Sequence, residues 1–407
     1  MRREIKTMNT RERAEHLARA AQNFVSLLGK ISADDLLEVV RCELGHEAAL
    51  DDFQKFAAHF SKAQSPETIL HIISGNTPHA GLQSLIRGLL VGARRNFCKL
   101  PSLPSSGGAA DVLQVIEKFR AALPAELAAR VETSCELPGE WLAQADAVIV
   151  FGSDETIAHF QKTVRIDQRF IAHGAMVSIG IVFNESEESN DAENFDFVAT
   201  LAARDASLFD QQGCLSPHGF YVEKSPEKFA ERLAREMEKF QAHTPRGALS
   251  VSEAAAIDEL RAMLRLRAAN GENVQLWCSE DSSAWTVFFD PQPTFSASCL
   301  NRVVFVKPLP LGAADFRAAL ENASAHLSAV GIWPATRENA ERVFLLDLGA
   351  SRICPIGRMQ MPPFSWHQDG GQNLAPLVRW IDFEPESEGS CFNHEGHEYH
   401  EERKKRD

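Results

Sequence analysis

Ala147-Val148-Ile149-Val150-Phe151-Gly152-Ser153 is the stretch that most clearly indicates how this chain folds. Its apolar, largely β-branched residues are typical of a strand that is buried on both faces. A glycine and a serine end the strand, and a helical pattern follows them. An earlier apolar run, 69–73, also ends at a turn and leads into a helix over 79–94. Strands that alternate with helices predict an α/β fold, in which helices cover both sides of a parallel sheet.

A second alternation begins after residue 175 and indicates a second α/β unit. Its periodicity predicts two strands and two helices, over 177–183, 191–209, 219–222 and 226–242. We therefore divide the chain into five parts. They are a helical N-terminal region packing on the first unit (1–68), the first unit (69–175), the second unit (176–354), a Pro-, Trp- and Gly-rich segment that folds back over the first unit (355–384), and a polar tail whose composition predicts disorder (385–407).

Composition excludes several classes of protein. The chain has 407 residues and a net charge of −14, which argues against nucleic acid or an anionic membrane as the main partner. No apolar run approaches the roughly 20 residues that a membrane span needs, and the start of the chain lacks the apolar centre of a signal peptide. The eight cysteines are scattered, as is typical of a reducing compartment. We expect a cytoplasmic protein.

One cysteine stands in a setting that suits a nucleophile. The stretch Asp210-Gln211-Gln212-Gly213-Cys214-Leu215-Ser216-Pro217 follows a helical pattern and precedes a short apolar run. A cysteine on such a turn can attack a substrate while nearby backbone N–H groups face the substrate oxygen. The alternative is a buried structural cysteine, although packing cysteines more often lie within an apolar stripe.

Four segments, taken in order, resemble the aldehyde dehydrogenase superfamily, and more narrowly its fatty acyl-CoA reductases of the LuxC type. They are Gly75-Asn76-Thr77-Pro78, Asn96-Phe97-Cys98-Lys99-Leu100-Pro101-Ser102, Val150-Phe151-Gly152-Ser153-Asp154-Glu155-Thr156 and Gln211-Gln212-Gly213-Cys214-Leu215-Ser216-Pro217. The motif Trp366-His367-Gln368-Asp369-Gly370, followed by Leu377-Val378-Arg379-Trp380, resembles the C-terminal signature of that branch. The resemblance covers roughly residues 69–382.

The resemblance implies an aldehyde dehydrogenase-like fold. In it, residues 69–175 form a Rossmann-type cofactor domain, residues 176–354 form an α/β catalytic domain, and a small bridging element serves a homo-oligomer. It implies that NADPH reduces a long-chain fatty acyl-CoA to the aldehyde through an acyl group carried on Cys214. The acyl group can also arrive from an acyl-protein synthetase partner, and the family is associated with bioluminescence.

By the same resemblance, the Asn76 side chain donates to the oxyanion together with the Cys214 backbone N–H; the alternative for Asn76 is a plain turn residue. Hydrolytic relatives carry a glutamate base before a Gly-Gly pair, whereas the matching stretch here is Phe170-Ile171-Ala172-His173-Gly174-Ala175. The missing carboxylate favours reduction over hydrolysis. His173 could relay a proton, or it could be structural.

Four residues are expected to bind the cofactor. Lys99 and Ser102 correspond to the family's site for the adenosine ribose, and a neutral serine admits the 2′-phosphate of NADPH. Arg94 and Arg95 are nearby candidates for that phosphate. Gly152 and Ser153 stand where a helix N-terminus faces the pyrophosphate. Many relatives have a second glycine where this chain has Ile157, so the way in which this chain binds the pyrophosphate and nicotinamide half of the cofactor stays open.

Other readings stay open. His367 and Asp369 could close the substrate tunnel or position the nicotinamide, although packing of a Trp-rich turn explains them as well. The series Cys391, His394, His397 and His400 has metal-ligand spacing but lies in the polar tail, so we expect no metal site. The rival functions are a reductase of short-chain or other acyl thioesters or of acyl phosphates, and a carrier or scaffold that holds acyl groups without reducing them. An aldehyde-oxidising enzyme is disfavoured by the missing glutamate.

Overall fold

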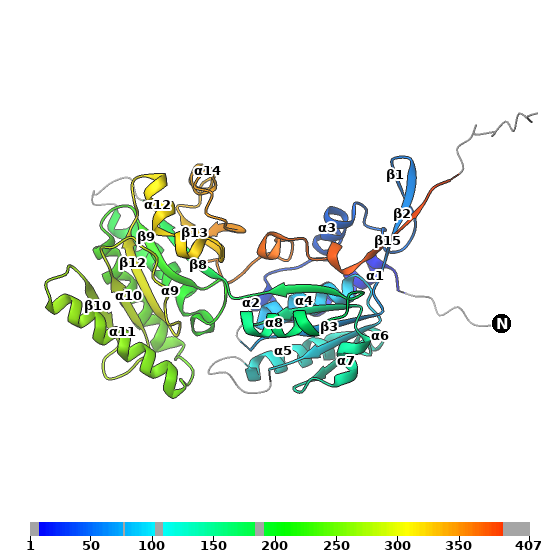
Figure 1. The fold of residues 1–407 in the computed structure, drawn as a ribbon, viewed down its shortest axis with the longest axis horizontal. Coiled ribbons are helices and arrows are strands. Elements are labelled where there is room, and N and C mark those ends of the chain that lie inside the picture. The colour runs from blue at the N-terminus through cyan, green and yellow to red at the C-terminus, as the bar shows by residue number, and fades with distance from the viewer. Residues whose placement is uncertain (1–7, 76–77, 102–108, 184–190, 386–407) are drawn as a thin grey trace, which may run out of the picture.

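The computed structural model describes residues 8–75, 78–101, 109–183 and 191–385, and these residues form two lobes (Figure 1). One lobe is built on a five-stranded sheet and the other on a seven-stranded sheet. Within the described residues, no helix combines the length and the apolar character that crossing a membrane requires. The α/β fold predicted from alternating strands and helices is confirmed.

The five-stranded sheet is parallel throughout and has the order β5-β4-β3-β6-β7. Its strands are β3 (Thr68–Ile72), β4 (Arg95–Lys99), β5 (Val131–Ser134), β6 (Ala147–Phe151) and β7 (Arg169–His173). Numbered along the chain, this is the order 3-2-1-4-5 of a Rossmann sheet. The chain reverses its direction of travel between β3 and β6, so the carboxyl ends of these two strands flank a crevice in which ligands bind.

Both faces of this sheet are covered, as the apolar β3 and β6 require, because every residue of these strands is buried. One face and the N-terminal helices share a single core, and Trp141 and Phe160 cover the other face. The helices of this lobe are α1 (Thr10–Ala21), α2 (Val25–Leu28), α3 (Ala33–Leu44), α4 (Pro78–Leu90), α5 (Ala109–Ala122), α6 (Ala125–Ala128), α7 (Gly139–Gln144) and α8 (Asp154–Thr163), with a 3₁₀ turn at Gln22–Phe24.

The N-terminal region is only partly helical. Capping boxes at Asn9 and Ser32 start α1 and α3 as the sequence pattern indicates. The helical structure predicted for the N-terminal region (1–68) is wrong at its end, because β1 (Gln54–Phe56) and β2 (His59–Gln64) form a hairpin there. The hairpin exists because a distant strand from the C-terminal part pairs with β2, which local periodicity cannot indicate.

The seven-stranded sheet has the order β10-β11-β12-β9-β8-β13-β14, and only β10 runs antiparallel to its neighbour. Its strands are β8 (Val177–Val182), β9 (Pro217–Val222), β10 (Gln275–Cys278), β11 (Thr286–Phe289), β12 (Val303–Pro308), β13 (Leu327–Trp333) and β14 (Arg352–Pro355). The helices of this lobe are α9 (Asp191–Ser207), α10 (Pro226–His243), α11 (Val251–Ala269), α12 (Ala313–Ala319), α13 (Glu321–Ser324) and α14 (Arg337–Leu345), with a 3₁₀ turn at Leu208–Gln211.

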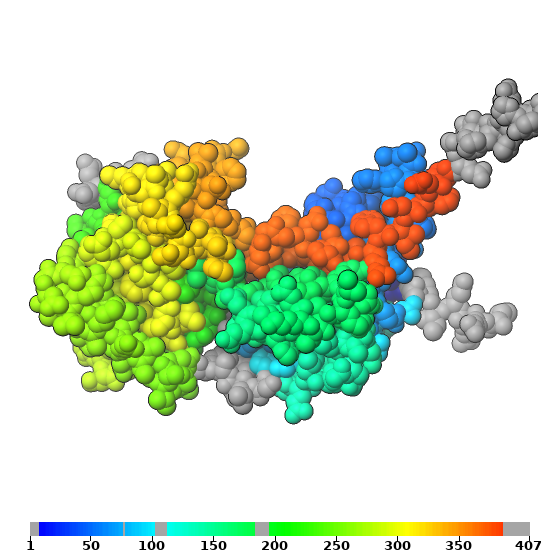
Figure 2. Space-filling model, viewed as in Figure 1, coloured from blue at the N-terminus to red at the C-terminus, as the bar shows by residue number. Residues whose placement is uncertain are grey.

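After β14 the chain returns to the first lobe, as the sequence predicts for residues 355–384. Figure 2 shows this return segment in orange, lying across both lobes. Arg87 of α4 holds it by donating to the Gln368 side chain at 2.8 Å, and Gln83 donates to the Pro362 carbonyl at 3.4 Å. The segment contains 3₁₀ turns at Gln368–Gly370 and Ala375–Leu377 and ends in β15 (Arg379–Phe383), which completes the antiparallel sheet β1-β2-β15.

Candidate active site

A cavity of about 680 Å³ lies between the two sheets and brings together segments that are far apart in the sequence. The five-stranded sheet contributes residues that follow the carboxyl ends of three strands, among them Ser74, Gly152 and Gly174. The seven-stranded sheet contributes the turn that carries Cys214, and the return segment contributes Gln368 and Asp369. Of the predicted site residues, Cys214, His173, Gly152 and Ser153 all line this cavity.

Cys214 lies on a turn between a 3₁₀ turn and β9, and its side chain is partly exposed. The Ser178 hydroxyl of β8 donates to the Cys214 carbonyl at 2.8 Å and accepts from the Ala329 N–H of β13 at 3.1 Å. One serine thus fixes the backbone of Cys214 to two strands of the sheet. Cys214 and the adjacent Leu215 also pack with Trp366 of the return segment.

The residues before Cys214 have an unusual backbone. Phe209, Asp210 and Gln211 have φ angles of 52°, 51° and 63°, the left-handed region that non-glycine residues seldom adopt. Buried side chains hold them there: Arg302 is paired with Asp210 at 2.7 Å, and the Gln211 amide donates to the carbonyls of Pro217 and Val303. These contacts hold the backbone of residues 209–211 against the sheet, and so they fix the direction in which the chain enters the turn at Cys214.

The free thiol is the stable form of Cys214 at neutral pH. Its pKa is raised to about 12, first by burial and then by the negative charge of Asp369, while the backbone N–H groups of Cys214 and Leu215 act in the opposite direction. A thiol with so high a pKa needs a proton acceptor before it can attack a carbonyl carbon.

His173, at the carboxyl end of β7, contacts Asp369 of the return segment. Its Nδ1 lies 2.6 Å from Asp369 Oδ2, and its ring stacks on Phe151 at a centroid distance of 4.6 Å. The sequence pointed to both residues separately but gave no reason to pair them. His367, the other candidate of that motif, is exposed and lies outside the residues that line the cavity.

His218 is a cavity residue that the sequence interpretation missed. The register between β8 and β9 pairs Ser178 with Pro217 and Ile179 with Gly219, so His218 is the extra residue of a β-bulge. Its Nδ1 accepts the Ser298 N–H at 3.0 Å, and burial lowers its pKa to about 4. The ring is therefore neutral and carries its proton on Nε2. A histidine four residues after a candidate nucleophile is the only sequence signal that could have drawn attention to it.

The chemistry of the crevice at β3 and β6 suits a dinucleotide. Gly152 and Ser153 follow β6, and α8 begins directly after them, with the Ser153 hydroxyl accepting the Thr156 N–H at 3.3 Å. A helix N-terminus of this kind favours phosphate oxygens. Ile157 packs close to Gly174, where an added Cβ would lie 3.2 Å from its Cδ1. Ile157 thus fills space between α8 and the end of β7.

The other predicted cofactor residues that the structure describes lie at opposite ends of β4. Lys99 is the last residue of β4, at the carboxyl edge of the sheet where the crevice lies. Arg94 and Arg95 are a correction: they lie at the opposite, amino end of β4, where they contact Glu67 and Gln144. The four peptide steps of β4 separate the two ends by about 13 Å. Asn76, Ser102 and the series from Cys391 to His400 lie outside the described residues.

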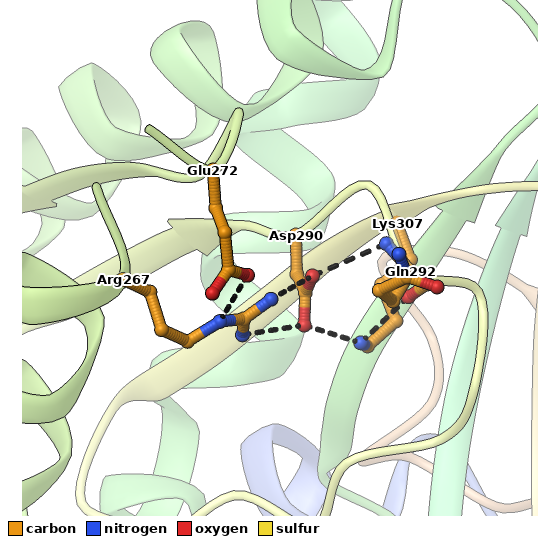
Figure 3. Close-up of polar contacts among 5 residues, drawn as sticks. All are labelled: Arg267, Glu272, Asp290, Gln292 and Lys307. Carbon is orange, nitrogen blue, oxygen red and sulfur yellow. Dashed lines mark hydrogen bonds and ion pairs between the residues drawn. The ribbon is translucent and has the colours of Figure 1, made fainter. Parts of the chain in front are cut away.

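A buried ionic cluster supports one wall of the cavity. Lys307 of β12 donates to the Asp290 carboxylate at 3.0 Å and to the Gln292 carbonyl at 2.9 Å, and Arg267 of α11 binds the same carboxylate at 3.1 Å (Figure 3). Glu272 binds Arg267 from the other side at 2.7 Å. These bonds fix the start of the loop whose later residues, Phe295 to Leu300, line the cavity.

Comparisons with known proteins identify relatives of this chain. A family model described as acyl-CoA reductase (LuxC) matches residues 1–380. The long-chain acyl-protein thioester reductase of Aliivibrio fischeri is 24% identical over 383 residues, which cover 91% of this chain and 75% of that protein. Long-chain acyl-protein thioester reductase 2 of Photobacterium leiognathi is 22% identical with the same coverage.

Solved structures support the fold. An NAD-dependent benzaldehyde dehydrogenase from Corynebacterium glutamicum has a TM-score of 0.60 at 14% identity, covering 93% of this chain and 86% of that one. An NAD-dependent aldehyde dehydrogenase from Sinorhizobium meliloti has a TM-score of 0.61 at 15% identity, with coverage of 92% and 82%. The predicted aldehyde dehydrogenase-like fold is confirmed.

Proposed function

The chain belongs to the LuxC family of acyl-CoA reductases, and from that premise we propose that it reduces a long-chain fatty acyl thioester to the aldehyde with NADPH. The acyl group would arrive as acyl-CoA or from an acyl-protein synthetase. The observation that carries the proposal is that Cys214 and the N-terminal turn of α8 line one cavity. A nucleophile and a phosphate-binding turn in one cleft support covalent capture followed by reduction.

Cys214 carries the acyl group in this proposal. Its sulfur attacks the thioester carbonyl carbon, and the leaving thiolate departs with a proton, so that an enzyme-bound thioester replaces the incoming one. The Cys214 backbone N–H and the Asn76 side chain donate to the oxyanion; losing one such donor typically costs about 10²–10³ in rate. Ser178 contributes by holding the Cys214 carbonyl in place.

A bound NADPH supplies the hydride that converts the captured acyl group to the aldehyde. Lys99 and Ser102 would hold its adenosine half, and Gly152 and Ser153 would hold its pyrophosphate. Strand order supports this direction, because β4 lies on the other side of β3 from β6 and β7, and residues at the ends of β6 and β7 line the cavity with Cys214. Hydrolysis competes poorly because Ala172 and His173 stand where hydrolytic relatives have a carboxylate base.

The direct test measures NADPH consumption with tetradecanoyl-CoA. The variant Cys214→Ala should lose at least about 10³-fold in rate, because no other group carries the acyl chain. The variant Cys278→Ala is the matched control, since Cys278 is also partly exposed but lies on β10, outside the cavity lining. Full activity of Cys214→Ala, or no turnover of any acyl thioester by the wild type, would reject the proposal.

Two rival functions are separable by simple measurements. A reductase of shorter acyl thioesters or of acyl phosphates would show its highest kcat/KM on those substrates in a chain-length series. A non-reducing acyl carrier would become acylated on Cys214 without binding NADPH at equilibrium. A cytoplasmic location and a homo-oligomeric state belong to the proposal as properties that the family resemblance implies.

A further inference from the structure

Asp369 and His173 form a pair that neither lobe could make alone. They are 196 residues apart in the sequence, and their side chains are only 23% and 14% exposed. Asp369 sits on a tight turn with a φ of 52°. The neighbouring Gln368 is held by Arg87, so Asp369 is fixed relative to the five-stranded sheet that carries His173.

The cavity offers few groups that could accept the Cys214 proton. Among the residues that the structure describes, the titratable ones that line it besides Cys214 are Asp154, His173, His218, His326 and Asp369. His218 is excluded, because its Nδ1 already accepts a backbone N–H and its Nε2 carries the proton. Asp154 and His326 are exposed, and the Asp154 carboxylate accepts the Ala175 N–H at 3.4 Å.

His173 and Asp369 remain. His173 Nδ1 lies 2.6 Å from Asp369 Oδ2, and this contact decides which nitrogen of His173 can act. A carboxylate accepts hydrogen bonds but does not donate them, so Nδ1 must carry a proton in this pair. The neutral ring then has its lone pair on Nε2, which is the form required of a base. A carboxylate on the far nitrogen also stabilises the imidazolium that forms when the ring takes up a proton.

We propose that Asp369 is a positioning residue that holds His173 as the general base for the Cys214 thiol, so that the return segment completes the active site. This inference rests on the proposed function. The Cys214 Sγ–H proton moves to His173 Nε2 as the C–S bond to the acyl carbon forms. The same proton then passes to the departing thiolate as the old C–S bond breaks, which restores the neutral ring and keeps atoms and charge balanced.

Electrostatics agree with a coupled pair. After burial, the negative charge of Asp369 is the next cause that raises the pKa of the Cys214 thiol and opposes its ionisation. Once His173 holds the proton, its positive charge offsets that of Asp369, and the new thiolate faces a neutral pair instead of a lone carboxylate. Transfer of the proton from Cys214 to His173 therefore neutralises the pair whose negative charge opposed ionisation of the thiol.

The test separates acylation from reduction by leaving NADPH out. Wild-type protein and variants are mixed with tetradecanoyl-CoA, and mass spectrometry follows the acyl group appearing on Cys214. In Asp369→Asn the rate at saturation should fall about 10²–10⁴-fold, because the base is no longer held in the active tautomer. The half-saturating thioester concentration should stay unchanged, since in this proposal Asp369 acts through His173 and not on the thioester.

A second variant tests the base itself. His173→Ala should be acylated as slowly as Asp369→Asn, and added imidazole should restore part of its rate, which a purely structural role would not allow. Asp167→Asn is the matched control, because it removes a carboxylate near the other end of β7 and should acylate at the wild-type rate. Equilibrium NADPH binding and the melting temperature should match the wild type in all three.

The outcomes are distinguishable. Acylation of Asp369→Asn at the wild-type rate would overturn the inference and leave the proposed function intact. So would failure of imidazole to restore His173→Ala, or a loss of NADPH affinity in Asp369→Asn as large as its loss of acylation rate. If the wild type takes up no acyl group from any thioester, the proposed function itself fails.

Discussion

Asp205 of α9 is a single carboxyl group that organises the first turn of the return segment. Its Oδ2 accepts the N–H groups of Gly357 at 2.5 Å and Met359 at 3.3 Å, and the Gln360 side chain donates to its carbonyl at 3.1 Å. Burial raises the pKa of Asp205 to about 7, against the opposing effect of those backbone N–H groups. The folded protein therefore holds a proton there that the unfolded chain releases near pH 4.

The sign of the resulting pH dependence follows from linkage. Between about pH 4 and pH 7 the folded state binds more protons at Asp205, so its contribution to stability falls as pH rises through that window. Asp205→Asn removes this titration but keeps an oxygen for the two N–H groups. We predict that the free energy of unfolding of the variant, relative to wild type, increases by up to about 4 kcal/mol from pH 4 to pH 7. Urea unfolding at several pH values checks this, and a pH-independent difference would contradict it.

Single residues also show what sequence reasoning can reach. Cys214 and the turn at Gly152 were predictable, because each lies in a local motif whose structure follows from a few neighbours. The pairing of His173 with Asp369 was not, since it depends on where the return segment crosses the first lobe. The sequence did not indicate His218 as a site residue, because a β-bulge decides where its side chain points. The residue pattern of β9 does not indicate a bulge.

The loop between β11 and β12 begins at a buried ion pair. Lys307 and Asp290 are 3% and 6% exposed, so each loses most of its hydration on folding and depends on the other. Arg267, which is partly exposed, adds a second contact to the Asp290 carboxylate (Figure 3). A buried pair of this kind costs more to break than it contributes when intact.

We predict that Lys307→Met lowers the free energy of unfolding by about 3 kcal/mol, because it leaves the Asp290 carboxylate with Arg267 as its remaining cation. Chemical denaturation measures the change. Lys239→Met is the matched control: Lys239 pairs with Glu236 on the surface of α10, 68% exposed, and its loss should cost under about 1 kcal/mol. Equal effects in the two variants would show that burial of the pair does not matter.

Elements were predictable where their own residues determine them. The buried strands β3 and β6 and the long helices α9 and α10 lie within a few residues of the predicted ranges. The hairpin of β1 and β2 was mistaken for helix because its exposed, mixed residues carry no clear period. Its strands form because β15 supplies hydrogen-bond partners from the far end of the described chain.

The small sheet β1-β2-β15 projects from the first lobe (Figure 1). Phe56, Phe383 and Trp380 are 63%, 54% and 45% exposed. A three-stranded sheet with so little core of its own gains stability when another surface covers it. The family resemblance implies a homo-oligomer, and this sheet is the surface we expect a second copy to cover.

We predict that the double variant Trp380→Ser and Phe383→Ser forms a smaller assembly than the wild type, measured by size-exclusion chromatography with light scattering. Leu266→Ser is the control, because Leu266 is an exposed apolar residue, 63% accessible, on α11 of the other lobe. A wild type that runs as a 45.0 kDa monomer, or a double variant with unchanged mass, would contradict the prediction.

The ladder between β2 and β15 has a consequence for biosynthesis. Ser61 and Asp382, which are hydrogen-bonded across it, are 321 residues apart. At roughly 5–20 residues added per second, a ribosome needs about 15–60 s between making the two strands. For that interval the emerging hairpin presents an unpaired edge to every other nascent chain nearby. Yield from a cell should therefore depend on holdase chaperones during translation more than on the strength of the finished fold.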